Sequence, residues 1–168
     1  MDLTIKSDAD LDQLVRNHEK APGGRDRPLY GELLEERGRR SDTKQLLKLD
    51  VSLEHLKQTA IAQQCTSYGE LAAASGVSWS KARQKMNGPS GHLDRLLDLS
   101  RVRGLPLLTA ICVNLDGLQS CELGEEALKG FAAGAERLGL RVDDPLAFHH
   151  QCREECWAWG RQQTDSQS

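Results

Sequence analysis

Aromatic residues are scarce in this chain. Phe, Trp and Tyr make up only 4% of its 168 residues, so the core must be built mainly from Leu, Ala and Val. No apolar run approaches the roughly 18 residues that a membrane-spanning helix needs. The first ten residues, "MDLTIKSDAD", also lack the apolar region of a signal peptide. We therefore expect no membrane partner and a cytoplasmic location.

The cysteines are odd in number and show no Cys-x-x-Cys spacing. In a chain of this length without an export signal, such cysteines are typical of reduced thiols rather than of a disulfide framework. We expect this state for all five, which are Cys65, Cys112, Cys121, Cys152 and Cys156.

Signatures of catalysis are missing as well. The sequence contains neither the G-x-S-x-G turn of a serine hydrolase nor the H-E-x-x-H helix of a zinc protease. Gly23-Gly24 has no strand before it and no Gly-Lys-Ser/Thr after it, so it does not match a phosphate-binding loop. We predict a protein without enzymatic activity and without a cofactor.

The net charge of −3 is unevenly distributed. Residues 51–103 carry 7 basic and 4 acidic side chains, whereas residues 104–168 carry 5 basic and 10 acidic ones. The overall charge argues against strong non-specific binding to polyanions, but the positive middle segment suits a local contact with nucleic acid. The acidic last third favours self-association or a protein partner instead.

The stretch "YGELAAASGVSWSKARQKMNG", residues 68–88, has the pattern of two short helices joined by a tight turn. Ala72 is small enough for a close helix crossing, Gly76 accepts a left-handed turn, and Val77 fills the junction. Ser78 suits the N-cap position of the second helix, which we place at 79–87. This order of features is typical of a helix-turn-helix.

The second of these helices has two different faces. Trp79, Ala82 and Met86 lie at i, i+3 and i+7, the spacing of inward-facing anchors. The remaining side chains are donors that can reach phosphates and base edges. These candidates are Ser78, Ser80, Lys81, Arg83, Gln84, Lys85 and Asn87, to which the following helix adds Arg95, Arg101 and Arg103 as phosphate contacts.

An apolar run, "LPLLTAICVN" at 105–114, ends in the turn signal "NLDG". This pattern predicts a buried strand that enters a β-hairpin with "LQSCEL" as the return strand. A hairpin after the helices gives the order of a winged helix-turn-helix. The predicted fold is mostly α, with a winged helix-turn-helix-like core, one short β-hairpin and flanking helices.

The chain is expected to divide into four segments. A helical N-terminal segment or arm includes a helix that Gly38 would stop, and a helical pair near the C-terminus packs on the core. The segments are 1–50 for the arm, 51–122 for the winged unit, 123–162 for the helical pair and 163–168 for a frayed tail.

"TSYGELAAASG" and "LPLLTAIC" resemble parts of the C-terminal domain of the alkylguanine-DNA alkyltransferases and their alkyltransferase-like relatives. The resemblance covers residues 66–114 and implies a winged helix with a DNA-facing helix. Cys112 lies near the position of the family's reactive cysteine, but the neighbouring Pro and His-Arg of that motif are absent. Alkyl transfer is therefore not expected, because no neighbouring base would lower the pKa of the thiol.

The helix near the C-terminus contains three side chains with metal-binding chemistry. His149, Cys152 and Cys156 lie at i, i+3 and i+7 and would need a fourth ligand, for which Cys121 is the candidate, to hold zinc. Cysteine is also a common buried residue, so we favour packing and predict no metal.

Trp157 and Trp159 are two residues apart, so they cannot both face one core. One of them would then lie on an exposed patch, and such tryptophans often mark a partner surface. Packing of the terminal helix against the N-terminal helices is the alternative that we favour.

The leading hypothesis is a non-catalytic DNA-binding protein with helix 79–87 in the major groove and the turn at 114–117 near the backbone. The alternative is a protein-interaction module on the same fold, with Trp157 and Trp159 as the partner surface. Either could form a homodimer through the acidic last third. A third hypothesis is a degenerate alkyltransferase-like binder of damaged bases, which requires a pocket beside Cys112 and an intercalating side chain.

Overall fold

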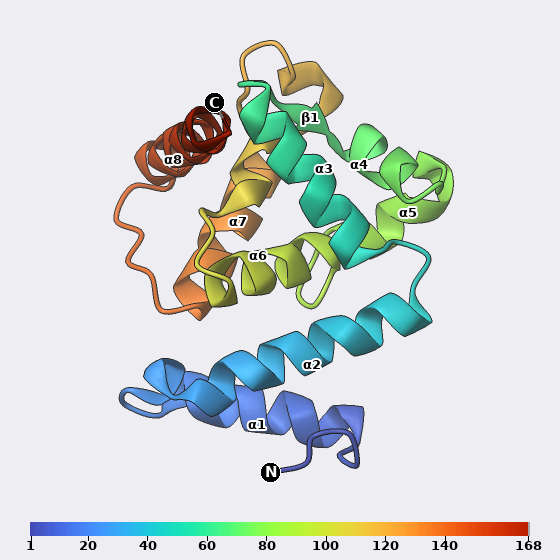
Figure 1. The fold of residues 1–168 in the computed structure, drawn as a ribbon, viewed down its shortest axis with the longest axis vertical. Coiled ribbons are helices and arrows are strands. Elements are labelled where there is room, and N and C mark those ends of the chain that lie inside the picture. Colours follow the sequence, from blue (N-terminus) through green and yellow to red (C-terminus); the bar gives the residue numbers. More distant parts are fainter. Residues whose placement is uncertain (168) are drawn as a thin grey trace.

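The computed structural model describes residues 1–167, and 68% of the protein is helical (Figure 1). The expectation of a mostly α fold is therefore confirmed. Within these residues no helix is both long and apolar enough to cross a bilayer. The eight α-helices are α1 (Asp8–Lys20), α2 (Pro28–Lys44), α3 (Leu49–Ile61), α4 (Tyr68–Ala74), α5 (Trp79–Met86), α6 (His92–Val102), α7 (Glu125–Arg137) and α8 (Pro145–Ser166).

The N-terminal helices α1 and α2 lie side by side at one end of the molecule (Figure 1). Ser7 caps α1 through a capping box with Asp10. Gly38, expected to end the second helix, instead lies buried inside α2, where its missing side chain lets Leu99 of α6 approach. Leu11 and Leu33 belong to the same core as the rest of the chain, so residues 1–44 are packed rather than a detached arm.

Helix α8 packs closely along α3. Gly160 makes this possible, since a Cβ at that position would overlap the carbonyl oxygen of Ala60 at the end of α3. Asp144 caps α8 by accepting hydrogen bonds from two backbone N–H groups, and Pro145 occupies the first turn. The helix continues through Ser166, so it covers most of the segment expected to be frayed, and residue 168 lies outside the described residues.

The predicted β-hairpin is wrong. The run at 105–114 instead forms a 3-10 turn, η2 (Leu108–Ile111), followed by the short strand β2 (Cys112–Val113). This strand pairs in parallel with β1 (Thr66–Ser67), with Thr66 opposite Cys112. Another 3-10 turn, η3 (Leu115–Gly117), stands in place of the predicted hairpin turn. The predicted return strand, residues 118–123, is a loop.

The physical reason lies in how η2 is surrounded. It contacts α3, α6 and α8, so the apolar run is buried on several sides. A continuous apolar run indicates burial but does not distinguish a strand from another buried segment. The return segment places exposed Gln119 and Ser120 in the loop, without a second buried face to pair.

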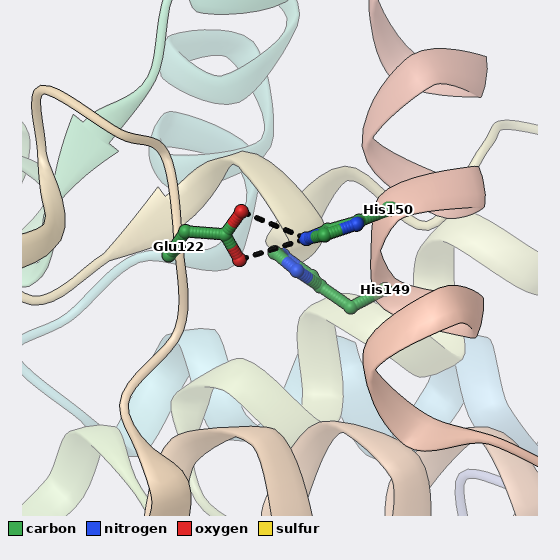
Figure 2. A group of neighbouring side chains, drawn as sticks. All are labelled: Glu122, His149 and His150. Carbon is green, nitrogen blue, oxygen red and sulfur yellow. Dashed lines mark hydrogen bonds and ion pairs between the residues drawn. The ribbon is translucent and has the colours of Figure 1, made fainter.

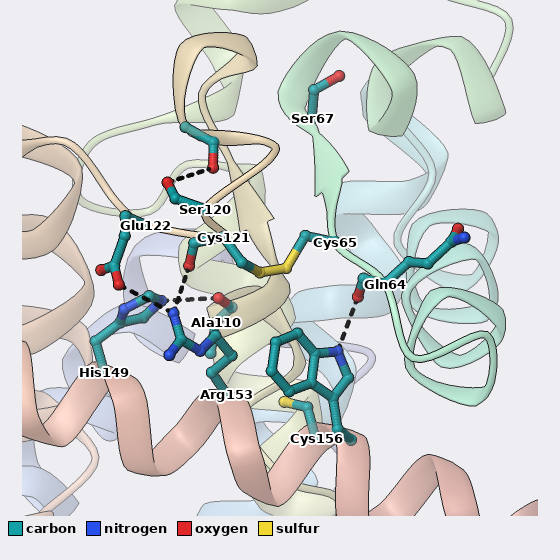
Figure 3. The surroundings of a disulfide bond; sticks show 12 residues. Gln64, Cys65, Ser67, Ala110, Ser120, Cys121, Glu122, His149, Arg153 and Cys156 are labelled. Atoms are coloured by element: carbon teal, nitrogen blue, oxygen red, sulfur yellow. Dashed lines mark hydrogen bonds and ion pairs between the residues drawn. A yellow bond between two sulfur atoms is a disulfide. The ribbon is translucent and has the colours of Figure 1, made fainter.

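The expectation of five reduced cysteines is also wrong. Cys65, just before β1, forms a disulfide with Cys121 in the loop after η3 (Figure 3). The pair is 56 residues apart in the chain, and no local spacing signals such a bond. The other three cysteines are free and buried.

A buried charge network joins the N-terminal helices to the rest. Asp98 of α6 is almost fully buried, and its carboxylate accepts a hydrogen bond from Arg37 of α2 at 2.9 Å. Arg137 of α7 binds the same carboxylate, and Arg95 approaches it at 3.4 Å. Removing one partner of such a network leaves charge buried without compensation, so Asp98 ties α2, α6 and α7 together.

Candidate nucleic-acid interface

Two short helices and a tight turn place the candidate interface on the surface. Ser67 caps α4 in a capping box with Glu70, whose backbone N–H donates to Ser67 Oγ at 3.2 Å. Gly76 has a φ of +73°, and the N–H of Val77 donates back to the carbonyl of Ala72 at 3.1 Å. Val77 and Ala72 are buried at the junction, as a helix-turn-helix crossing requires.

The inner face of α5 consists of Ala82 and Met86, which are both buried. Trp79, expected as a third inward anchor, is 39% exposed. It lies at the start of the helix, where it stacks on Tyr68 with ring centroids 6.1 Å apart. Ser78 occupies the N-cap position, but its hydroxyl contacts Ser80 rather than a backbone N–H.

The outer face of α5 presents the polar side chains that the sequence singles out. In the part of the chain that the structure describes, the three cations of this face, Lys81, Arg83 and Lys85, have no ion-pair or side-chain hydrogen-bond partner. The exposed side chains are Ser78, Ser80, Lys81, Arg83, Gln84, Lys85 and Asn87.

Helical geometry orders this outer face. Successive residues are turned by about 100°, so Gln84 points almost opposite to Ala82 and Met86, with Ser80 one turn before it. Lys81 and Lys85 lie on one flank of this line, and Arg83 lies on the other. The Gln84 amide therefore lies at the centre of the outward face, with cations on both sides of it. This arrangement suits contact with a base edge that is flanked by phosphates.

The three arginines expected from α6 do not extend this surface. Arg95 is buried against Asp98, so it cannot contact a phosphate, and that expectation is wrong. Arg103 pairs with Glu35 at 2.9 Å. Arg101 is exposed, but it lies about 14 Å along α6 from His92, the end of the helix nearest α5.

Cys112 is not a reactive thiol in this fold. Its side chain is 1% exposed, and burial raises its pKa well above the ordinary thiol value. A thiol that stays protonated at neutral pH is a poor nucleophile. The geometry therefore offers no alkyl-transfer chemistry at this position.

A cavity of about 680 Å³ nevertheless lies beside Cys112. Its walls are mostly apolar and come from α6, α7 and the loop after α5, with Leu97 and Phe131 among them. Thr109 also lines it, and the buried Thr109 hydroxyl has no hydrogen-bond partner within residues 1–167. Sequence reasoning did not identify Thr109, because a lone threonine in an apolar run is no signal.

The two tryptophans of α8 are half-buried and packed against the core. Trp157 Nε1 donates to the carbonyl of Gln64 at 2.9 Å, and the Arg153 guanidinium lies 5.5 Å from the ring centroid. Neither Trp157 nor Trp159 forms the exposed patch expected of a partner surface.

The three candidate metal ligands of α8 are buried, but they do not converge as a set. Cys156 Sγ donates to the carbonyl of Leu107 at 3.3 Å, and burial raises the pKa of Cys152 to about 12. His149 groups with other residues instead: its imidazole lies beside His150 and Glu122 (Figure 2). Sequence reasoning passed over His150, although it adjoins His149, and nothing local marked Glu122.

No protein-family model, curated protein or solved structure matches this chain. Functional argument therefore rests on the geometry of the side chains themselves.

Proposed function

We propose that this protein binds double-stranded DNA without catalysis and lays α5 in the major groove. The observation that carries the proposal is the set of exposed, unpaired cations on α5, namely Lys81, Arg83 and Lys85. Many other cations of the chain are ion-paired, as Arg37 is with Asp98. Unpaired cations on one short helix are available to phosphates and cost no internal ion pair when they bind.

Gln84 supplies the base-reading element of the proposal. At the crest of α5 its amide can donate to and accept from an adenine edge, a contact worth about 1–3 kcal/mol of discrimination. The resemblance of residues 66–114 to the alkyltransferase family supports the same helix as the DNA-facing one. Helix-turn-helix proteins often bind as dimers to two half-sites, so a homodimer is part of the proposal.

The test is a titration of a fluorescent mixed-sequence duplex, followed by anisotropy at about 50 and about 200 mM salt. Three phosphate contacts give a slope of log K against log salt of about −2.7, which is roughly a 40-fold loss over this range. The double variant Lys81→Ala/Arg83→Ala should flatten the slope by about 2.

The matched control is Arg16→Ala/Lys20→Ala, which removes one arginine and one lysine from the exposed side of α1. It should bind as the wild type does. Gln84→Ala should keep the salt slope and lose preference among duplex sequences. The absence of binding at low salt, or equal losses in the two double variants, would contradict the proposal and favour a protein partner.

A second candidate function, a degenerate alkyltransferase-like binder of damaged bases, is favoured by the cavity beside Cys112. The cavity meets one of the two requirements of that hypothesis, and the free hydroxyl of Thr109 offers a hydrogen bond to a base. Gly130 lines the cavity and has no neighbouring atom within 4 Å of an added Cβ, so Gly130→Leu should fill it.

The experiment compares a duplex carrying one alkylated guanine with its unmodified counterpart. Tighter binding of the lesion duplex, lost in both Gly130→Leu and Thr109→Val, is the expected outcome for this function. Equal affinity for the two duplexes would exclude it while leaving the α5 proposal intact.

A further inference from the structure

The side chains of Glu122, His149 and His150 form a cluster between α8 and the loop after η3. Each residue offers one ligand atom, and these atoms lie within 4.8 Å of one another (Figure 2). Two residues come from the first turns of α8, and the third comes from the loop that follows η3. Glu122 lies 28 residues before His150, so the fold brings the carboxylate to the two adjacent histidines.

His149 holds a ring nitrogen free for a ligand. Its imidazole is completely buried, and Nε2 lies 2.8 Å from the carbonyl oxygen of Ala110. A carbonyl only accepts, so Nε2 carries the proton and Nδ1 carries a lone pair. That buried Nδ1 has no hydrogen-bond partner within residues 1–167, an arrangement that is costly unless something binds it.

The same bond to Ala110 is the outer contact that metal-binding histidines usually make. A histidine ligand commonly donates its other N–H to a backbone carbonyl, which fixes the tautomer and the ring orientation. With the proton on Nε2, the imidazole presents the Nδ1 lone pair that a metal ligand needs.

Glu122 and His150 complete the donor set at the surface. His150 Nε2 lies 2.8 Å from both carboxylate oxygens of Glu122. Arg153 also donates to the Glu122 carboxylate, at 3.2 Å. Both side chains are half-exposed, so an ion can reach them from solvent.

We propose that Glu122, His149 and His150 form a binding site for a divalent transition metal, with zinc as the ion that fits best. Two imidazoles and one carboxylate suit zinc, and a fourth position would remain open to water. Ligand atoms around tetrahedral zinc are about 3.4 Å apart. Atoms now up to 4.8 Å apart must therefore approach by up to about 1.4 Å, and His150 Nε2, 2.8 Å from Glu122, must move away by about 0.6 Å. The half-exposed His150 and Glu122 side chains have room for this shift.

Binding would change one hydrogen bond and one proton position. The bond between His150 and Glu122 is replaced by two bonds to the metal, and the Nε2 proton of His150 moves to Nδ1 through solvent. Arg153 keeps its bond to the Cys121 carbonyl at 3.0 Å (Figure 3). The bound ion would link the loop after η3, which carries Glu122, to α8, which carries both histidines.

Zinc titration of the full-length protein by calorimetry tests the site, with the disulfide intact and no reductant present. We expect one equivalent of zinc, and a loss of at least about tenfold in affinity in both Glu122→Ala and His150→Ala. The controls are Glu155→Ala, an exposed carboxylate elsewhere on α8, and His18→Ala on α1, which should bind as the wild type does. Folding of each variant is checked by circular dichroism.

Cobalt(II) gives a second readout of the ligand set. We expect d–d absorption bands without a thiolate charge-transfer band, because all three ligands are nitrogen or oxygen. A thiolate band would assign the metal to Cys152 or Cys156 and overturn the proposal. The absence of metal binding, or equal zinc affinity in wild type and both ligand variants, would overturn it as well. None of these outcomes involves DNA, so the site is tested independently of α5.

Discussion

Ser52 of α3 and His92 at the start of α6 are joined by a buried hydrogen bond, with Ser52 Oγ 2.7 Å from His92 Nε2. His92 begins α6 directly after the loop that leaves α5, so this bond holds the start of α6 against α3. Burial lowers the pKa of His92 to about 4. The contact is therefore made by the neutral imidazole.

The stability of the protein should fall as acid is added, through His92. Its pKa in the unfolded chain is about 6.5, so between pH 6.5 and 4 the unfolded state binds a proton that the folded state does not. The stabilisation is complete above pH 6.5 and is lost as the pH falls towards 4. From pH 7 to 5 this amounts to about 2 kcal/mol.

Urea unfolding of wild type and His92→Gln across this range measures the effect. Gln can still hydrogen-bond Ser52 but does not titrate, so the variant should lose about 2 kcal/mol less than the wild type between pH 7 and 5. Parallel curves for the two proteins would show that His92 is not the group responsible.

The buried carboxylate of Asp98 should be more important for stability than the surface ion pairs. Asp98→Asn leaves Arg37 and Arg137 without their buried counter-charge, and we expect a loss of about 3–5 kcal/mol. Asp50→Asn is the matched control, because Asp50 is largely exposed where it meets Arg103. That change should cost less than about 1 kcal/mol. Urea unfolding at pH 7 measures both, and equal losses would contradict the argument.

Local signals predicted the helix pair at residues 68–88. The turn at Gly76 and the N-cap at Ser78 correspond to observed helix boundaries. These features depend on residues within one helical turn, which is the range over which capping acts. The same reasoning was wrong at Gly38, because the close approach of Leu99 from α6 favours glycine inside a continuous helix.

The errors concern contacts between distant residues. Arg95 resembles a surface cation in the sequence, and only Asp98 and its partner Arg37, 61 residues away, show why it is buried. The bond between Cys65 and Cys121 and the cluster at Glu122 likewise depend on how the loop after η3 returns to the core. Periodicity and spacing carry no information about such pairings.

The packing of α8 on α3 should tolerate no side chain at Gly160. Gly160→Ala would place a methyl group against the backbone carbonyl of Ala60, which cannot move without shifting α3. We expect a destabilisation of at least about 2 kcal/mol from this overpacking. Thermal and urea unfolding followed by circular dichroism measure it.

Gly130→Ala is the control, since Gly130 is an exposed helical glycine with no atom within 4 Å of an added Cβ. Replacing it should stabilise α7 by about 1 kcal/mol, because alanine favours the helix. If both variants were stabilised, the close contact between α8 and α3 would not exist as described.

Reduction of the disulfide between Cys65 and Cys121 should destabilise the protein by about 4 kcal/mol. The bond closes a loop of 56 residues, and in the chain-entropy model a loop of this length gives a stabilisation of that size. The effect should appear as a lower urea midpoint in dithiothreitol.

Two variants serve as controls for this prediction. Cys65→Ala/Cys121→Ala should match the reduced wild type and show no response to the reductant, whereas Cys152→Ala should keep that response. A wild type that unfolds identically with and without dithiothreitol, with its thiols titrated to confirm reduction, would contradict the prediction.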